Sequence, residues 1–295
     1  MNQMRLKALA KINLGLDVLR RKEDGYHEVK MIMQTINLHD QIHMKKIEED
    51  EIRVRTNLYY LPTNENNLVY KAAKMLKDEF NLPGGISINL KKVIPVAAGM
   101  AGGSSDAAAV LFGMNKMYGL KLSMQELKDR GVKLGADVPY CIMRGTALAE
   151  GIGEKLTKLP AMPKCHILIA KPPINVSTKF VYENLHANDL KPEDHPPVDV
   201  QLEALKEGDL EKLVANMGNV LERVTVPEYP VINEIKQLMV DNGAMGAMMS
   251  GSGPTVFGVF TSYAKAKEAS EKIEQSGLSK QIYLTTPYNQ REGNE

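Results

Sequence analysis

The run Pro95-Val96-Ala97-Ala98-Gly99-Met100-Ala101-Gly102-Gly103-Ser104-Ser105 leads directly into Asp106 and an apolar helical pattern that extends to Met117. Small residues let backbone N–H groups approach a ligand closely, and glycine accepts positive φ where a turn requires it. A helix that begins after such a loop has unpaired N–H groups and a partial positive charge at its start. We therefore interpret this loop as a phosphate site, in preference to a tight strand–helix connection with serine as the helix cap.

The loop does not match the common nucleotide-binding motifs. It lacks the terminal Gly-Lys-Ser/Thr of a Walker A loop and the G-x-G-x-x-G dinucleotide fingerprint, and the protein-kinase motifs are missing from the chain. The hydroxyls of Ser104 and Ser105 are candidates to contact phosphate oxygens or a magnesium ion, for which no acidic ligand is evident. The sequence therefore indicates a rarer type of phosphate loop.

The rest of the chain predicts an α+β protein. Residues 6–18 alternate apolar and polar, which is typical of a long half-buried strand. Further strands are predicted at 26–37, within 38–56, and at 86–90, 165–170, 244–249, 255–260 and 281–285, and helices at 67–80, 106–117, 123–134, 177–185, 200–222, 229–241 and 263–275. Glycine, lysine and proline crowd together near 151–164, so we place two domains at residues 1–155 and 156–295.

Composition excludes several functional classes. The net charge of +1 and the absence of tryptophan argue against binding to nucleic acid or to an anionic membrane. The two cysteines, Cys141 and Cys165, have neither disulfide-framework nor metal-ligand spacing. No segment has the length and apolarity of a signal peptide or a membrane span. We expect a soluble, cytoplasmic protein, and monomer or homodimer is left open.

Outside the loop, single residues are ambiguous when each is taken alone. Lys11 lies on the polar face of the first strand, where a solvated lysine is the usual explanation. Asp137 follows the expected helix stop at Gly135, and an isolated aspartate there more often caps a turn. The segment 24–27 reads as a turn before a strand, and the Gly-Ser segment 250–254 reads equally well as a strand connection or a second ligand loop.

Taken together, these motifs resemble a known family. The run from Pro95 to Ala109 is similar to the phosphate loop of the galactokinase–homoserine kinase–mevalonate kinase–phosphomevalonate kinase (GHMP) superfamily. Ala-Lys-Ile-Asn at 10–13 and Asp-Gly-Tyr-His at 24–27 resemble the branch that phosphorylates 4-diphosphocytidyl-2-C-methyl-D-erythritol, as do the segments 135–139 and 249–255. The motifs span residues 10 to 255; Met100 stands where leucine is frequent, and Ala97, Ala98 and Ala101 replace possible glycines.

The resemblance implies a fold and an activity. The fold is the two-domain GHMP kinase fold, with an N-terminal α/β domain like ribosomal protein S5 and a C-terminal ferredoxin-like α/β domain. The activity is transfer of the γ-phosphate of ATP, with Mg²⁺, to the 2-hydroxyl of an acceptor that carries a cytidine diphosphate group, in the non-mevalonate isoprenoid pathway.

It also implies roles for particular residues. Asp137 matches the general base and Lys11 its electrostatic partner, a pairing that suits phosphoryl transfer. The loop from Pro95 to Ser105 matches the ATP-phosphate site. The cytidine side is matched by a further set of residues: Asn13, Tyr26, His27, Thr178 and Tyr182.

Two alternatives remain at this stage. One is another GHMP kinase that acts on a small alcohol, of the homoserine or mevalonate type, and the Tyr-His pair at 26–27 argues against it because that pair suits a nucleobase. The other is a nucleotide-binding regulator without catalytic activity, and the presence of both Lys11 and Asp137 argues against that.

Overall fold

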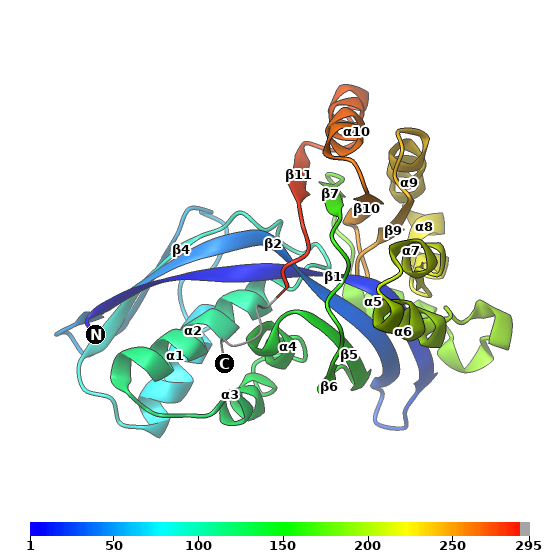
Figure 1. The fold of residues 1–295 in the computed structure, drawn as a ribbon. Helices are drawn as coiled ribbons and strands as arrows, with labels where there is room; N and C mark the ends of the chain where they lie inside the picture. The colour runs from blue at the N-terminus through cyan, green and yellow to red at the C-terminus, as the bar shows by residue number, and fades with distance from the viewer. Residues whose placement is uncertain (290–295) are drawn as a thin grey trace. The chain divides into compact units, whose positions relative to one another are not determined.

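The computed structural model describes residues 1–289, which divide into two compact units (Figure 1). Unit 1 comprises residues 1–10, 38–96 and 101–143, and unit 2 comprises residues 11–37, 97–100 and the chain from Arg144 onward. The two longest strands, β1 (Gln3–Arg21) and β2 (His27–Ile47), each contribute residues to both units. The predicted division at 155/156 follows chain order and stays a prediction.

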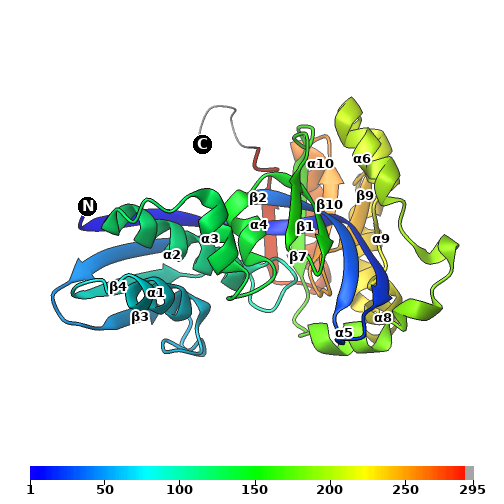
Figure 2. The ribbon, with the colours of Figure 1, turned by 90° about the horizontal axis from the view of Figure 1, so that it is seen from below.

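Unit 1 is a sheet with helices packed on it. Its strand order is β3-β4-β2-β1, with β3 (Ile52–Thr56) parallel and β2 antiparallel to β4 (Gly85–Lys91). The four helices are α1 (Leu68–Glu79), α2 (Gly102–Tyr118), α3 (Met124–Gly131) and α4 (Val138–Met143). The apolar helix α2 lies between the others and contacts all three (Figures 1 and 2).

Unit 2 contains the second half of β1 and the first half of β2. There β1 pairs with the short parallel strand β8 (Gly218–Asn219), and β2 pairs with the hairpin β5 (Thr146–Gly151) and β6 (Lys155–Lys158). Four helices flank β8 in the chain: α5 (Thr178–Asn184), α6 (Val198–Glu207) and α7 (Leu210–Ala215) precede it, with short 3₁₀ turns at 187–189 and 192–194, and α8 (Glu222–Glu228) follows it.

A separate four-stranded sheet completes unit 2. Its strands are β7 (His166–Lys171), β9 (Gly246–Met249), β10 (Val256–Phe260) and β11 (Gln281–Thr285). They lie in the order β11-β7-β10-β9, and every neighbouring pair is antiparallel. In chain order this is 4-1-3-2, and α9 (Val231–Asp241) and α10 (Tyr263–Ser276) pack on it (Figure 1). The arrangement is ferredoxin-like, as the resemblance implies. Within the described residues, no helix is both long and apolar enough to span a membrane.

Several local predictions are confirmed. The expected helix at 67–80 is α1, whose first turn is capped by the Asn67 side chain through the Val69 N–H. Ser123 and Glu126 form the capping box that the sequence indicates for α3. The strands predicted at 86–90, 165–170 and 281–285 are found within one residue of their expected ends.

Other boundaries were predicted incorrectly. The helix expected from Asp106 begins four residues earlier, at Gly102, so the Gly-Gly-Ser-Ser segment is its first turn rather than loop. The helix expected to reach residue 134 ends at Gly131, and Gly135 does not have the positive φ of a helix-ending glycine. The helical pattern at 200–222 is divided where Gly208 takes a φ of 69° and ends α6. The hairpin β5–β6 was not predicted, because its strands of six and four residues are too short for a clear periodic signal.

A glycine fixes how closely α2 approaches the sheet of unit 1. A Cβ atom at Gly113 would lie 2.4 Å from Met44 Sδ and 2.8 Å from Leu6 Cδ1. We expect Gly113→Val to destabilise the protein by about 2 kcal/mol, the usual cost of overpacking a core. The matched control is Lys116→Val on the exposed face of the same helix, which should cost only the difference in helix propensity, about 0.5 kcal/mol. Urea unfolding curves measure both, and equal losses would contradict the close packing at Gly113.

Candidate active site

The loop before α2 has an alternating backbone conformation. Ala97, Gly99 and Ala101 have φ values of 50°, 69° and 54°, whereas the residues between them do not have positive φ. Left-handed residues in alternation with residues of negative φ are a feature of backbone concavities that bind anions, so this loop is a candidate for such a site. Two of these left-handed residues are alanines, which cost more in this conformation than glycine. Strain of this kind is kept where a binding site needs it.

The start of α2 adds to this anion site. Ala101 is the N-cap residue, and no side chain caps the first turn. Its N–H groups are therefore available to a ligand, and the helix dipole places partial positive charge there. The two serines of this turn differ: Ser105 is buried and its Oγ donates 2.7 Å to Leu9 O, whereas Ser104 Oγ makes no hydrogen bond within the described residues.

Lys11 lies in unit 2, and its backbone contacts the phosphate loop. The Lys11 N–H donates to Met100 O at 3.2 Å, and Lys11 Nζ donates to Asn13 Oδ1 at 2.6 Å. Both side chains are buried, and within the described residues Lys11 has no carboxylate partner. A buried ammonium without an anionic partner is costly unless a ligand supplies the negative charge. Burial of Lys11 therefore excludes the alternative interpretation as an ordinary solvated lysine.

Asp137 lies in unit 1, at a turn that the sequence did not fully predict. It directly precedes α4, and its carbonyl accepts the first hydrogen bond of that helix from Cys141 N at 3.0 Å. The carboxylate is half-buried and makes no hydrogen bond within the described residues. Two residues earlier, a Cβ at Gly135 would lie 3.8 Å from Ser104 Oγ. Within unit 1, the turn that carries Asp137 thus packs beside the first turn of α2.

The residues predicted for the cytidine side are brought together in part, all within unit 2. The rings of His27 and Tyr182 lie 5.0 Å apart with an angle of 51° between their planes. Partial burial, with a smaller contribution from Arg21, lowers the pKa of His27, which favours the neutral imidazole. Thr178 Oγ1 is 2.8 Å from Ser252 Oγ, whereas Tyr26 is 61% exposed.

The Gly-Ser segment 250–253 supports the phosphate loop. Ser250 Oγ donates to Gly99 O at 3.0 Å, and a Cβ at Gly99 would lie 2.1 Å from Ser250 O. Asn219 Nδ2 donates to the carbonyls of Met249 and Gly251 and holds the segment in place. The segment connects β9 to β10, which confirms the interpretation as a strand connection, and it also packs closely against the loop.

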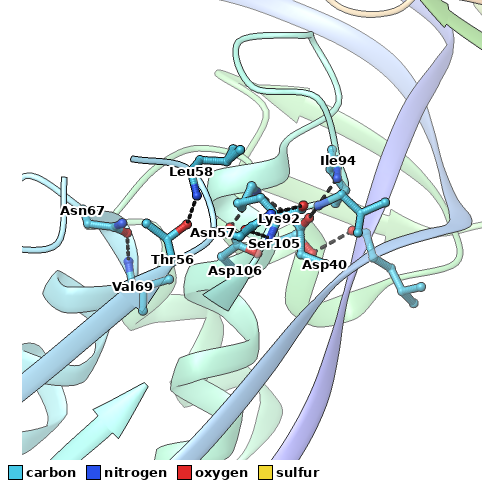
Figure 3. Close-up of polar contacts among 12 residues, drawn as sticks. Asp40, Thr56, Asn57, Leu58, Asn67, Val69, Lys92, Ile94, Ser105 and Asp106 are labelled. Carbon is cyan, nitrogen blue, oxygen red and sulfur yellow. Dashed lines mark hydrogen bonds and ion pairs between the residues drawn. The ribbon is translucent and has the colours of Figure 1, made fainter. Parts of the chain in front are cut away.

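Sequence reasoning missed a buried ionic cluster in unit 1, formed by Lys92, Asp40 and Asp106 (Figure 3). Its signal was present in β2, where residues 38, 40, 42 and 44 share the buried face, so that a carboxylate falls at a core position. A buried carboxylate needs a charged or hydrogen-bonding partner. The identity of that partner, 52 residues away, cannot be read from periodicity.

The donor set also bears on magnesium. Within the described residues, no group of three or more His, Cys, Asp or Glu side chains is placed to hold a metal ion. The hydroxyl of Ser104 is an oxygen ligand that suits Mg²⁺, which retains waters and binds substrate phosphates. The site thus fits a magnesium ion held mainly by a nucleotide, with Ser104 as a protein contact.

Comparisons with known proteins agree with this geometry. The family described as GHMP kinases N terminal domain matches residues 67–145, and the family described as GHMP kinases C terminal matches residues 201–279. A 4-diphosphocytidyl-2-C-methyl-D-erythritol kinase of Lachnospira eligens is 58% identical over 98% of this chain and 99% of its own. The enzyme of the same name from Clostridium perfringens is 46% identical over 97% of this chain and 99% of its own.

Solved structures show the same relationship. A crystal structure of 4-(cytidine 5'-diphospho)-2C-methyl-D-erythritol kinase has a TM-score of 0.82 and 32% identity, covering 97% of this chain and 100% of that chain. A homoserine kinase from Cytophaga hutchinsonii has a TM-score of 0.80 but only 20% identity, covering 98% of this chain and 96% of that chain. The latter match shows the fold alone.

Substitutions at Gly99 in the loop and at Gly103 in the first turn of α2 distinguish an effect on folding from an effect on ligand binding. A Cβ at Gly103 would meet only Leu68 Cδ1, at 3.5 Å, whereas a Cβ at Gly99 would clash with the Ser250 carbonyl. We expect Gly103→Val to leave the thermal midpoint nearly unchanged and to weaken ATP binding at least about tenfold, because its side chain would occupy space that a phosphate needs. Gly99→Ala should instead destabilise the protein by about 2 kcal/mol.

Calorimetry with ATP and thermal unfolding test this pair. Unchanged ATP affinity in folded Gly103→Val would place the nucleotide elsewhere.

Proposed function

This chain belongs to the 4-diphosphocytidyl-2-C-methyl-D-erythritol kinases of the GHMP kinase family, and on that premise we propose how its residues carry out the reaction. The activity is transfer of the γ-phosphoryl group of ATP to the 2-hydroxyl of 4-diphosphocytidyl-2-C-methyl-D-erythritol, a step toward isoprenoid precursors that does not use mevalonate. The assignment rests on 58% sequence identity to a kinase of that name over 98% of the chain.

The phosphate loop and α2 bind the ATP phosphates in this proposal. Residues 95–105 offer backbone N–H groups from the alternating segment 97–101 and from the uncapped first turn of α2. These donors are fixed before the ligand arrives, so they stabilise phosphate charge without reorganising. Bound Mg²⁺, if held by the nucleotide and Ser104, would offset charge that develops on the phosphate oxygens.

Asp137 acts as the general base. Its carboxylate makes no hydrogen bond within the described residues, so it is available to accept the proton of the acceptor hydroxyl. The α4 turn fixes its backbone, because Asp137 O and Gly135 O accept the hydrogen bonds that begin this turn. After the proton is taken, the acceptor oxygen bonds to the γ-phosphorus and the bond to the β–γ bridging oxygen breaks, which releases ADP.

Lys11 is the electrostatic partner of this transfer. Its ammonium is buried, bonded to the neutral Asn13 amide, and not neutralised by a carboxylate within the described residues. Positive charge held in a low-dielectric surrounding stabilises the negative charge of the transferring group more strongly than the same charge in water.

The acceptor's cytosine is bound by the aromatic side chains of unit 2. His27 and Tyr182 form a pair on which a base can stack, and a neutral imidazole can both donate and accept hydrogen bonds at its edge. Tyr26, exposed in the structure, is available to cover the base, and we assign Asn13 and Thr178 to polar contacts with the same substrate. Action in the cytoplasm and a monomeric or homodimeric state stay predictions.

The role of Asp137 can be tested by a near-isosteric change. We expect Asp137→Asn to lower kcat by about 10²–10⁴-fold, the usual contribution of a positioned base, while both substrates still bind. Lys11→Met should also lower kcat. If the two residues serve the same step, the double variant should lose much less than the product of the single losses.

The measurement is a coupled assay of ADP release with and without the acceptor. Near-wild-type turnover by Asp137→Asn would exclude Asp137 as the base. ATP consumption that does not depend on the acceptor would contradict phosphoryl transfer to that acceptor. A protein that binds ATP but transfers nothing would be the regulator considered above.

The cytosine site predicts base discrimination. We expect kcat/KM for the cytidine acceptor to exceed that for its uridine analogue by at least about 10²-fold, because a buried mismatch of donor and acceptor leaves polar groups unpaired. Tyr182→Leu should reduce this preference without changing KM for ATP. Equal kcat/KM for the two acceptors would contradict the assignment of His27 and Tyr182.

A further inference from the structure

The buried cluster of Lys92, Asp40 and Asp106 connects the two ends of the phosphate loop (Figure 3). Lys92 Nζ donates to Asp40 Oδ2 at 2.5 Å and to Asp106 Oδ2 at 2.8 Å. Lys92 directly follows β4, where the chain enters the loop, and Asp106 lies in α2, where the chain leaves it. All three residues belong to unit 1.

Asp40 extends the connection to the loop's backbone. Its other oxygen, Oδ1, accepts from Val93 N at 2.5 Å and from Ile94 N at 2.8 Å. One carboxylate therefore holds the two residues that precede Pro95 and, through Lys92 and Asp106, the helix α2 that follows Ala101. The cluster thus sets the separation between the two ends of the seven-residue loop from Pro95 to Ala101, namely residues 93–94 before it and α2 after it.

Lys92 is fixed at its backbone as well as at its tip. Lys92 N donates to Asn57 Oδ1 at 2.7 Å, and Asn57 Nδ2 donates to Lys92 O at 3.1 Å. With both backbone groups and the ammonium engaged, the Lys92 side chain is held in one arrangement.

The charge balance shows that Lys92 is not itself a phosphate ligand. Its side chain is only 4% exposed, and its one positive charge faces two carboxylates. Burial lowers the pKa of Lys92, but Asp106 and Asp40 outweigh burial, so the net shift is upward and the ammonium stays charged. Burial raises the pKa of Asp106, against the opposing effect of Lys92. A cluster with this balance offers no excess positive charge to ATP.

We propose that Lys92 is a positioning residue for nucleotide binding: by joining Asp40 to Asp106, it fixes the spacing of the loop's two ends and thereby the geometry in which the loop presents its N–H groups to the ATP phosphates. The inference rests on the proposed function in taking ATP as the loop's ligand. It assigns Lys92, Asp40 and Asp106 a role that neither base catalysis nor acceptor binding contains.

The main test removes the bridge together with one charge of each sign, while the backbone N–H groups of Val93 and Ile94 still bond to the remaining Asp40 carboxylate. In Lys92→Met/Asp106→Leu one positive and one negative charge disappear together, a change that buried ion pairs often tolerate. Asp40 retains its two bonds to the loop backbone. We expect the dissociation constant for ATP, measured by calorimetry without acceptor, to rise about tenfold or more, which is the effect typical of losing a charge-assisted hydrogen bond. KM for the acceptor should stay within about twofold.

Asp106→Asn is the conservative variant. Its amide keeps an oxygen for Lys92, and its NH₂ takes the place of Asp106 Oδ1, which is buried without a partner within the described residues. We expect its ATP affinity to remain within about threefold of wild type, since the bridging bond is retained. The matched control is Glu79→Gln, which weakens the Arg130–Glu79 pair elsewhere in unit 1 and should leave ATP affinity unchanged.

Asn57→Ala keeps the proposal testable if the double variant does not fold. Asn57 is exposed, so its loss does not open the core, yet it removes both bonds to the Lys92 backbone. We expect a rise in the ATP dissociation constant of about threefold or more. ATP affinity within about twofold of wild type in the folded double variant, or in Asn57→Ala where the double variant is unfolded, would overturn the proposal. Because ATP binding is read without acceptor, absence of phosphoryl transfer by the wild type would refute the proposed function and not this inference.

Discussion

The uncapped N–H groups at the start of α2 are the feature on which the rest of the site depends. A helix start that no side chain caps is a cost in the absence of a ligand, and it becomes a binding site only if the preceding backbone turns its own N–H groups the same way. The positive φ values at 97, 99 and 101 are of the kind found in anion-binding backbone of this type. Two hydrogen bonds from outside the loop hold this conformation: Lys11 N donates to Met100 O, and Ser250 Oγ donates to Gly99 O. The conformation of the loop therefore depends on β1 and on the segment 250–253, which bond to its backbone.

Lys11 and Lys92 are both buried, but they differ in the charge of the groups that they contact. Lys92 faces two carboxylates that neutralise its charge, so it can affect the loop only by fixing positions. Lys11 is equally buried but bonded to a neutral amide, so the protein leaves its charge for an anion to neutralise. Desolvation of an ammonium is tolerated only with a compensating charge. The contrast supports the two proposals, electrostatic stabilisation by Lys11 and positioning by Lys92, although both lysines are similarly buried.

Much of this could be predicted from sequence, and the failures have physical causes. The alternation over 6–18 predicts β1 and places Lys11 on its polar face, because a strand's period of two assigns every side chain to one face. The glycine–serine loop predicts an anion site for similar local reasons. The first turn of α2 was missed because Gly102 and Gly103 have poor helix propensity, which tertiary packing overrides. The α4 helix, with Pro139 near its start, is too short for a periodic signal. The link between Asp40 and Lys92, and the pairing of His27 with Tyr182, depend on contacts between distant segments, which local patterns do not encode.

The alanines of the loop raise a last question, since glycine would adopt positive φ at Ala97 and Ala101 without strain. An alanine in the left-handed region costs roughly 1–2 kcal/mol. In return, alanine has fewer conformations than glycine in the unfolded chain, so less entropy is lost when the loop is ordered. A loop of glycines would be free to leave the anion-binding conformation in the absence of ligand, and ATP would then have to order it on each binding event. Alanine at alternate positions, and the hold of Asp40 and Lys92 on the ends of the loop, both reduce the ordering that ATP would have to supply. The departures from a glycine-rich pattern therefore favour a preformed phosphate site rather than weaken the case for one.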